Sequence, residues 1–348
     1  MSEQGMHPGM GRREFLKNAM LGIGSVVLSA SGLQAATNPD EETTALDLRI
    51  TCTTEILRVP GGKTFKMWVP IPPGDREQEI SGLAVDTNMP YFKTQESVWQ
   101  NKMVFIFIGA GDVKAGDKVA LSYRMKRKAA GTVSDVQEDP KRYMTPSEWE
   151  KWDDAVIKFT DDLVGGETDP VKIGRKVYDA IIDRVTYVHE ACGRGVSSFT
   201  LEEKVGRCDE FHALFRSMMM YKGIPVKWEQ GILLPYPSNL KKTGEFDADC
   251  INAHSWVKFH IGGGKWMPAD LSEAKRRPEL RNYYFGRITP NRIKMSTGRG
   301  FNLDPKQDGI INTFPYAYAE GDGIPLIYSH HYRNVMRYEL VGKSTERM

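Results

Sequence analysis

Apolar and polar side chains alternate along the first third of the chain. In residues 46–52 and 119–125 every second side chain is apolar, which is typical of a strand with one buried face. Two further segments, 65–69 and 103–108, have strand-like composition, and runs rich in glycine and proline separate the segments. Short strands with turn signals and no helical spacing predict a small β-sandwich over residues 45–127.

Helical spacing begins after a polar, unpatterned stretch at residues 126–143, where we expect a domain boundary. The segment Thr145-Pro146-Ser147-Glu148 fits a capping box with proline at the first helical position, and it predicts a helix over residues 149–163. Asp169 followed by proline predicts the start of a second helix.

Strand patterns return after Gly231. Residues 255–261 and 265–268 read as two strands, and three consecutive glycines between them predict a hairpin. Helices followed by strands in one region indicate the α+β class for a second domain at residues 140–348.

The first 36 residues have the pattern of an export signal. The pair Arg12 and Arg13 is followed by a weakly apolar stretch at residues 21–33 and by small residues that end at Ala36. This order predicts a twin-arginine (Tat) signal segment over residues 1–36 and a periplasmic or extracellular mature protein. The alternative is an amphipathic N-terminal helix with an accidental arginine pair. No later apolar run is long enough for a membrane span.

The composition excludes two classes of protein. Hydrophobic residues make up 40% of the chain, which is enough for packed cores and argues against a disordered chain. The 47 basic and 45 acidic residues nearly balance, with a net charge of +2, so no nucleic-acid partner is expected.

The four cysteines have different contexts. Cys52 falls on the apolar side of its strand, which predicts a buried core thiol. Cys192 and Cys250 are candidates for a disulfide in an oxidising compartment, although spacing alone does not establish the pairing. Cys208 directly precedes a helical apolar stripe that Gly223 and Pro225 close.

A cysteine at a helix start is a candidate nucleophile. The unpaired N–H groups and the positive end of the helix dipole favour a thiolate, and we expect them to lower the pKa of Cys208 from the usual value of about 8.5. The alternative is a buried structural cysteine.

His254 lies in a strand pattern at residues 252–259, and Asp270 ends the segment 264–270, so the two can face each other across adjacent strands of the predicted hairpin. Asp270 would then orient the imidazole through one nitrogen, while the other nitrogen meets the thiol. Two other arrangements remain open at this point. His212, four residues after Cys208, is a second candidate base. Together Cys208, His212, Cys250 and His254 also form a Cys2His2 set with the donors of a closed zinc site.

The order of these motifs resembles the transglutaminase-like superfamily, in particular an exported bacterial subgroup with a β-rich N-terminal half. The core resemblance spans roughly residues 173–270. Its motifs are Gly206-x-Cys208-x-x-Phe211-x-x-Leu214-Phe215, Gly223-Ile224-Pro225, His254-x-Trp256-Val257 and Trp266-x-Pro268-x-Asp270, with Tyr284-Phe285-Gly286, Asn291-Arg292 and Gly298-Arg299 in the tail.

The resemblance implies a papain-like core of helices packed on an antiparallel sheet, with a Cys–His–Asp triad and no cofactor or metal. Cys208 would be the nucleophile, His254 the general base and acid, and Asp270 the residue that orients the imidazole. The backbone N–H of Cys208 is one expected oxyanion donor. Tyr187 is the candidate for the second, the alternative being a structural tyrosine at a helix end.

The expected activity is acyl transfer from a peptide, isopeptide or amide through a thioester on Cys208. No sequence feature builds a site for an amine acceptor, so the pattern favours a hydrolase acting on a peptide or protein substrate. A true transglutaminase with an amine acceptor is one alternative. A non-catalytic binding protein that retains the fold is another.

Overall fold

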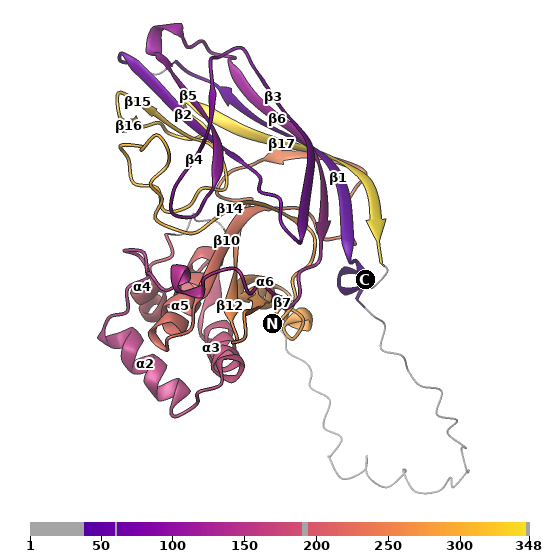
Figure 1. The fold of residues 1–348 in the computed structure, drawn as a ribbon, viewed down its shortest axis with the longest axis vertical. Coiled ribbons are helices and arrows are strands. Elements are labelled where there is room, and N and C mark those ends of the chain that lie inside the picture. The colour runs from indigo at the N-terminus through magenta and orange to yellow at the C-terminus, as the bar shows by residue number, and fades with distance from the viewer. Residues whose placement is uncertain (1–37, 60, 190–193, 346–348) are drawn as a thin grey trace, which may run out of the picture. The chain divides into compact units, whose positions relative to one another are not determined.

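Three five-stranded sheets form the framework of the computed structural model, which describes residues 38–59, 61–189 and 194–345 (Figure 1). In strand order, the first sheet consists of β11 (Thr243–Asp247), β17 (Tyr332–Ser344), β1 (Ala45–Ile56), β6 (Lys118–Lys128) and β3 (Gln78–Thr87). The second sheet consists of β16 (Ile324–Pro325), β15 (Tyr318–Gly321), β2 (Thr64–Ile71), β5 (Lys102–Gly109) and β4 (Phe92–Gln95).

The third sheet carries the helices. It consists of β14 (Arg292–Thr297), β10 (Val226–Leu233), β12 (Ala253–His260), β13 (Lys265–Ala269) and β7 (Val133–Ser134). The helices are α1 (Pro39–Glu42), α2 (Asp154–Val164), α3 (Pro170–Arg184), α4 (Ser197–Glu203), α5 (Cys208–Tyr221) and α6 (Leu271–Arg276), with 3-10 turns η1 (Ala110–Asp112), η2 (Pro140–Tyr143) and η3 (Pro278–Leu280). A short parallel pair, β8 (Thr186–Tyr187) and β9 (Val205–Gly206), precedes α5.

One face of the long strands β1 and β6 serves two cores. Near one end of these strands, Ile56 and Val119 pack against the second sheet and complete a sandwich. Near the other end, Leu48 and Met125 pack against residues of β10 and β14 in the third sheet. Side chains two residues apart share a face of a strand, so one apolar stripe fits both partners.

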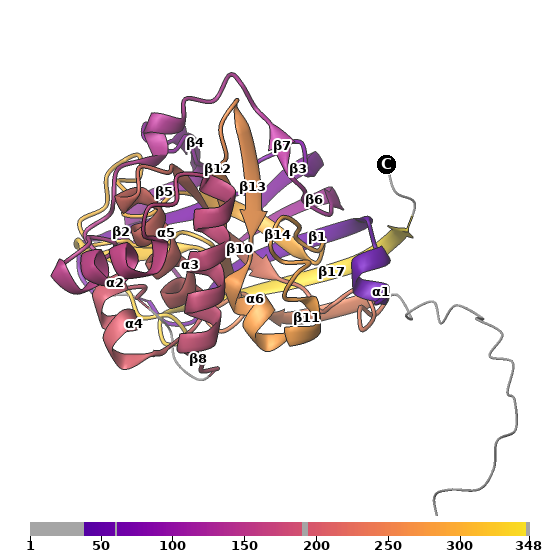
Figure 2. The same cartoon turned by 90° about the horizontal axis from the view of Figure 1, so that it is seen from below.

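Helices α3 and α5 pack on the third sheet around the largest core, which includes Val177, Phe211, Phe215 and Phe259. In Figures 1 and 2 these helices lie on one side of β10 and β12. This layering of helices on an antiparallel sheet, beside an all-β sandwich, confirms the predicted α+β class.

The first and the last of the long strands lie side by side in the first sheet. The sequence pattern did not indicate this pairing. Strand β17 pairs antiparallel with β1, from Ala45 opposite Ser344 to Ile56 opposite Tyr332. Strand β15 pairs in the same way with β2 of the second sheet. The sandwich is therefore built from both ends of the chain, and the expected division into residues 45–127 and 140–348 remains a prediction.

The helix expected at residues 149–163 begins later, at Asp154, and that boundary was wrong. The side chain of Asp153 caps it by accepting a hydrogen bond from the Val156 N–H at 2.9 Å. Within the expected capping box, Ser147 donates instead to Glu150, whose carboxylate also binds the buried guanidinium of Arg216. A buried ion pair therefore holds this segment in turns.

The predicted export segment lies outside the described residues. Among the described helices, none combines the length and the apolar character needed to cross a membrane.

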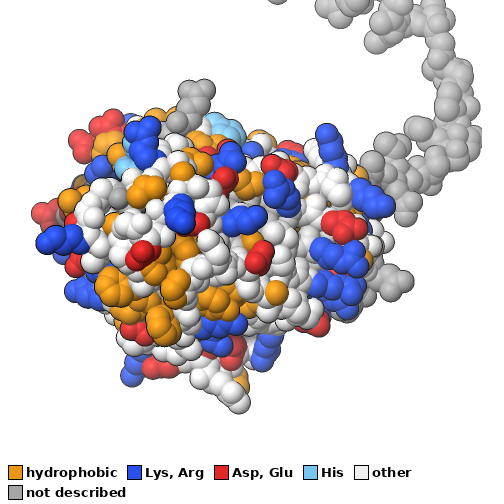
Figure 3. Space-filling model, turned by 90° about the horizontal axis from the view of Figure 1, so that it is seen from above, with side chains coloured by type: hydrophobic (Ala, Val, Ile, Leu, Met, Phe, Trp, Pro, Cys, Tyr) orange, Lys and Arg blue, Asp and Glu red, His pale blue; other side chains and the backbone are white. Residues whose placement is uncertain are grey.

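The outer surface of the sandwich exposes some large apolar side chains. Figure 3 shows the molecule from above, with hydrophobic side chains gathered beside Lys and Arg on this face. Phe92 of β4 and Phe107 of β5 are 64% and 52% exposed, and Ile324 of β16 is 69% exposed. Nothing in the structure indicates what would cover them.

We predict that the aromatic contact between α5 and β12 holds the helical layer on its sheet. Phe215 and Phe259 are fully buried, and their ring centroids lie 5.7 Å apart in a T-shaped pair. Replacing either residue by alanine should lower the free energy of unfolding by about 3–5 kcal/mol. The double variant should lose about 0.5–1.5 kcal/mol less than the sum. Urea unfolding measures these losses, and Phe107→Ala, at an exposed site, should change stability by less than about 0.5 kcal/mol.

Candidate active site

Cys208 is the first residue of α5, and local contacts fix this helix start. The side chain of Glu210 accepts a hydrogen bond from the Arg207 N–H at 2.9 Å, which satisfies one of the unpaired donors of the first turn. A side chain at position 206 would place its Cβ 2.2 Å from that of Glu210, so glycine is required there. The Arg207 guanidinium donates to the carbonyl of Ile251 at 2.7 Å and thereby ties the helix start to the loop before β12.

Cys208 lines a narrow chamber. Its side chain is only 6% exposed, and its Sγ lies 4.0 Å from the carbonyl oxygen of Ala253. The chamber has a volume of about 80 Å³ and is lined by Arg207, Cys208, Asp209, Gln230, Cys250, Ala253, His254, Thr313, Pro315 and Tyr316. The sequence pattern offered no reason to expect the 313–316 loop at this site, because it lies about 60 residues or more from His254 and Cys208 along the chain.

Burial controls the acidity of this thiol. Burial raises the pKa of Cys208 to about 12, and the Asp209 carboxylate adds to the rise, while Arg207 and hydrogen bonds from Ser255 oppose it. The expectation that the helix start would lower the pKa was therefore wrong, because desolvation of the charged form outweighs the N-terminal donors. At neutral pH the resting thiol is protonated and needs a base to become a nucleophile.

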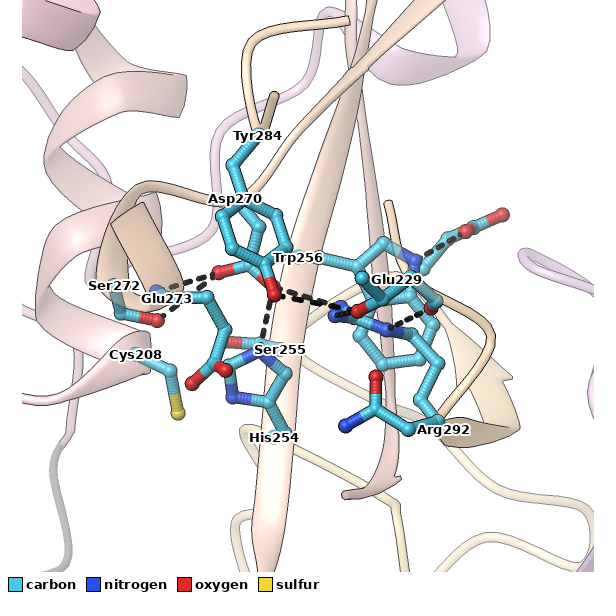
Figure 4. A network of polar contacts seen from close by, with 12 residues as sticks. Cys208, Glu229, His254, Ser255, Trp256, Asp270, Ser272, Glu273, Tyr284 and Arg292 are labelled. Atoms are coloured by element: carbon cyan, nitrogen blue, oxygen red, sulfur yellow. Dashed lines mark hydrogen bonds and ion pairs between the residues drawn. The ribbon is translucent and has the colours of Figure 1, made fainter. Parts of the chain in front are cut away.

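His254 and Asp270 meet as the hairpin pattern predicted. His254 lies on β12, and Asp270 follows β13 as the N-cap of α6. The His254 Nε2 lies 2.8 Å from the Asp270 Oδ2, and both side chains are buried. Figure 4 shows the Cys208 thiol pointing toward the His254 ring, and both residues line the chamber. Because Nε2 is bound to Asp270, Nδ1 is the ring nitrogen left for the thiol.

The Asp270 carboxylate is fully satisfied. Its Oδ1 accepts hydrogen bonds from the Glu273 N–H at 3.0 Å and the Ser272 hydroxyl at 3.2 Å. Its Oδ2 accepts from His254 and, at 2.7 Å, from Nη1 of Arg292. Burial alone would raise the pKa of Asp270, but the charges of His254 and Arg292 outweigh it and hold the pKa well below its usual range. The carboxylate is therefore ionised at neutral pH.

Arg292 of β14 is a site residue to which the sequence assigned no role. Its side chain is fully buried, and its guanidinium carbon lies 4.9 Å from the ring centre of Trp256. The same indole stacks on the His254 ring at 6.1 Å between centroids and donates to Glu229 at 2.6 Å. Arg292 therefore anchors the carboxylate and supports the tryptophan beneath the imidazole. The motif Asn291-Arg292 was visible in the sequence, but the sequence did not indicate which residue Arg292 would bind.

His212 is excluded as the base by its own hydrogen bonds. Its Nδ1 lies 2.7 Å from the Cys208 carbonyl oxygen, to which it donates, and its Nε2 accepts from the Leu271 N–H at 3.0 Å. Both ring nitrogens are thus occupied inside the core, where the side chain is fully buried.

The Cys2His2 zinc alternative is also excluded. Cys250 is disulfide-bonded, and a disulfide sulfur does not supply the thiolate that zinc requires. His212 has no free nitrogen to offer, as described above. Cys52 and Cys208 are free thiols, and Cys192, the predicted partner of Cys250, lies outside the described residues.

Tyr187 lies on the short strand β8, which pairs with β9, the strand that precedes Cys208 and α5. Burial raises the pKa of Tyr187, and the negative charge of an ionised Cys208 would add to that rise. The guanidinium carbon of Arg276 lies 5.4 Å from the centre of its ring. A part in oxyanion binding remains a prediction for this residue.

A wide groove opens beside the chamber. It has a volume of about 640 Å³ and shares Arg207, Ala253 and His254 with the chamber. Its walls include Tyr187, Tyr236 and Tyr338, together with residues of β11. A buried cysteine and a histidine bound to an ionised aspartate therefore lie beside an open groove.

Known proteins resemble parts of this chain in sequence or in fold. Residues 157–271 match the model of the transglutaminase-like superfamily. An uncharacterized protein of Haemophilus influenzae is 25% identical over 349 residues, covering 87% of this chain and 94% of its own length. A candidate cysteine protease from Cytophaga hutchinsonii shares the fold, with a TM-score of 0.55 and 14% identity over 87% of this chain and 92% of its own. The periplasmic domain of TgpA from Pseudomonas aeruginosa aligns with a TM-score of 0.35 and 12% identity over 69% of this chain and 94% of its own.

The fold and the site define a helix-borne cysteine beside a histidine- and aspartate-bearing hairpin. The chain contains a transglutaminase-like core at residues 157–271, as the sequence motifs predicted.

We predict that Arg292 keeps Asp270 ionised. In Arg292→Met the buried carboxylate loses its cation, so the free energy of unfolding at pH 7 should fall by about 3–5 kcal/mol. An aspartate whose pKa is lowered by folding stabilises the protein above its unfolded value of about 3.9, and this contribution is lost as pH falls through the folded pKa. With a higher Asp270 pKa in the variant, less of this contribution remains to be lost, so the free energy of unfolding should fall less steeply below about pH 5 than it does in the wild type, as urea unfolding between pH 3 and 7 would measure. An unchanged pH profile would count against this role.

We predict that the charge of Asp209 lowers the reactivity of the Cys208 thiol. Its charge raises the pKa of Cys208, so Asp209→Asn should lower that pKa and increase the thiolate fraction at pH 8. The rate of Cys208 alkylation by iodoacetamide should therefore rise several-fold, as peptide mapping by mass spectrometry would show. Asp249→Asn is the control, since Asp249 caps the loop before β12 through the N–H groups of Ile251 and Asn252. A slower reaction in Asp209→Asn would disprove the electrostatic account.

Proposed function

We propose that this protein is an exported, thiol-dependent acyl-transfer enzyme that acts on a peptide, isopeptide or amide bond. One observation carries the proposal: Cys208 and His254, whose Nε2 is bound to Asp270, line a single chamber, and His254 also lines the wide groove beside it. In this proposal Cys208 is the nucleophile, His254 the base, and Asp270 the residue that orients His254.

The first step needs proton transfer, because burial raises the pKa of the thiol to about 12. His254 Nδ1 accepts the thiol proton as Sγ attacks the carbonyl carbon of the scissile bond, and a tetrahedral intermediate forms. When the intermediate collapses, the C–N bond breaks and the imidazolium returns the proton to the leaving amine. The acyl group remains on Cys208 as a thioester.

Asp270 acts through His254. Its bond to Nε2 holds the tautomer with Nδ1 free to accept the thiol proton, and its charge stabilises the imidazolium that follows. Arg292 and the first turn of α6 hold the carboxylate in place. The backbone N–H of Cys208 and the Tyr187 hydroxyl are the donors we assign to the oxyanion.

The second step consumes the thioester. Water attacks the carbonyl carbon, His254 takes its proton, and the C–S bond breaks to regenerate the thiol and release a carboxylic acid. An amine acceptor would give transglutamination by the same sequence. We favour water, because it is the concentrated nucleophile in an open groove and no feature of the sequence builds an amine site.

Export is supported by two observations. The twin-arginine pattern at residues 1–36 is that of a Tat signal. Cys250 is disulfide-bonded, which is typical of a protein that works in an oxidising compartment.

Cys52 provides an internal control for the reactivity of Cys208, because it is a second free thiol in the same protein. Burial raises the pKa of both Cys52 and Cys208 to about 12, and both are free. We predict that iodoacetamide alkylates Cys208 at least about tenfold faster than Cys52 at pH 7–8, because only Cys208 has a base beside it. His254→Ala should remove the difference, and His212→Asn, which keeps a donor for the Cys208 carbonyl, should preserve it.

The same comparison of alkylation rates tests the variant Asp270→Asn. Asparagine favours the wrong histidine tautomer, and the same change in a serine triad lowers turnover by about 10⁴-fold. The alkylation advantage of Cys208 should therefore shrink strongly. Equal reactivity of Cys52 and Cys208 in the wild type, or an advantage that survives His254→Ala, would refute the proposed catalytic pair.

A further inference from the structure

The wide groove meets strand β11 along its edge. Four consecutive residues of this strand, Thr243, Gly244, Glu245 and Phe246, line the groove. Successive side chains of a strand point to opposite faces, so a wall made of consecutive residues includes the backbone edge. Gly244 can contribute only backbone. Strand β17 occupies one edge of β11, and β11 is the last strand of its sheet, so the groove faces the other edge.

The pairing with β17 identifies which backbone groups face outward. The Lys242 carbonyl accepts from the Leu340 N–H at 2.7 Å, and the Ala248 N–H donates to the Asn334 carbonyl at 2.8 Å. Hydrogen-bonded residues alternate in an antiparallel pair, so those of β11 turned toward β17 are Gly244 and Phe246.

The residues between them are turned the other way. The N–H and C=O groups of Thr243 and Glu245 point away from β17, and within the described part of the chain they have no hydrogen-bond partner. Beyond them, the Asp247 carbonyl accepts from the Asn252 side chain at 2.7 Å, which closes that end of the edge. The edge thus offers two residues for pairing.

This edge is continuous with the candidate active site. Ala253 and His254 line the same groove as Thr243 and Glu245. Phe246 and Tyr338 form an aromatic contact between ring centroids 6.4 Å apart, and Tyr236 lines the groove with them. A Cβ at position 244 would lie 2.3 Å from the Tyr338 ring, so glycine lets the ring lie against the strand. A peptide in the groove would meet both a backbone edge and an aromatic surface.

We propose that the substrate is an extended polypeptide segment that pairs through its backbone with the outward edge of β11 and places an apolar side chain against Tyr236, Phe246 and Tyr338. This proposal rests on the proposed function and names its substrate class. Backbone pairing supplies affinity that is largely independent of sequence, while the aromatic surface supplies side-chain preference. The substrate must then be an unfolded segment, a loop or a tail.

The test separates the backbone of Glu245 from its side chain. Glu245→Pro removes the outward N–H and leaves every hydrogen bond to β17, whereas the control Glu245→Ala removes the same side chain and keeps the N–H. Both variants lose the exposed ion pair with Arg337, which contributes little to stability. The probe is a library of unstructured, randomised decapeptides whose cleavage is followed by mass spectrometry.

We expect Glu245→Pro to lower kcat/KM for the cleaved peptides about five- to tenfold, the effect of one lost hydrogen bond, and Glu245→Ala to change it by less than about twofold. Both variants should keep the wild-type alkylation rate of Cys208. Equal kcat/KM in the two variants would overturn the pairing and leave the proposed function intact.

A second measurement does not depend on the proline variant. In Cys208→Ala, the amides of Thr243 and Glu245 should exchange with deuterium rapidly without peptide and slowly with the best-cleaved decapeptide bound. Bound peptide without this protection would overturn the proposal. The proposal would also be overturned if the wild type cleaved no decapeptide although the alkylation rate of Cys208 still depended on His254. If that dependence is itself absent, the proposed function fails and this inference fails with it.

Discussion

The buried carboxylate of Asp270 is the interaction that holds the site together. It is charged and out of contact with water, so it is tolerated only because four donors surround it. Those donors come from β12, the first turn of α6 and β14, so one charge joins three elements of the helical layer. The position of the His254 ring is a consequence, since its Nε2 is one of the four donors and Trp256 packs against its face.

The chemistry of the thiol follows from the same burial. A cysteine at a helix start is expected to be acidic, but here desolvation and the neighbouring Asp209 keep it protonated. A neutral thiol is a weak nucleophile, so the proposed function requires His254 to accept its proton. The precision of the Asp270 network therefore matters more to this site than the helix dipole does.

The long first sheet links the site to a surface that a substrate could occupy. Strands β1 and β6 cover both the second and the third sheet with a single apolar face. The return of the chain as β17 adds β11 at the edge, and this brings Thr243 and Glu245 to the groove that contains His254. The β-rich part of the chain, whose role the motifs leave open, thus supplies one wall of the groove.

The elements with local signals could be located from the amino-acid sequence alone. Period-two stripes located β1 and β6, and a glycine-led apolar stripe located α5. A glycine turn between two strands brought His254 and Asp270 near each other, because both lie toward the open end of that hairpin. The remaining features depend on contacts between distant parts of the chain. Strand β17 pairs with β1, which lies almost 300 residues earlier in the chain. The Arg292 guanidinium binds the Asp270 carboxylate from a different strand of the sheet. Helix α2 starts at Asp154 because Arg216 binds Glu150, and the thiol is neutral because of its burial. Each of these depends on which distant groups exclude water or supply charge, and a local pattern of residues does not contain that information.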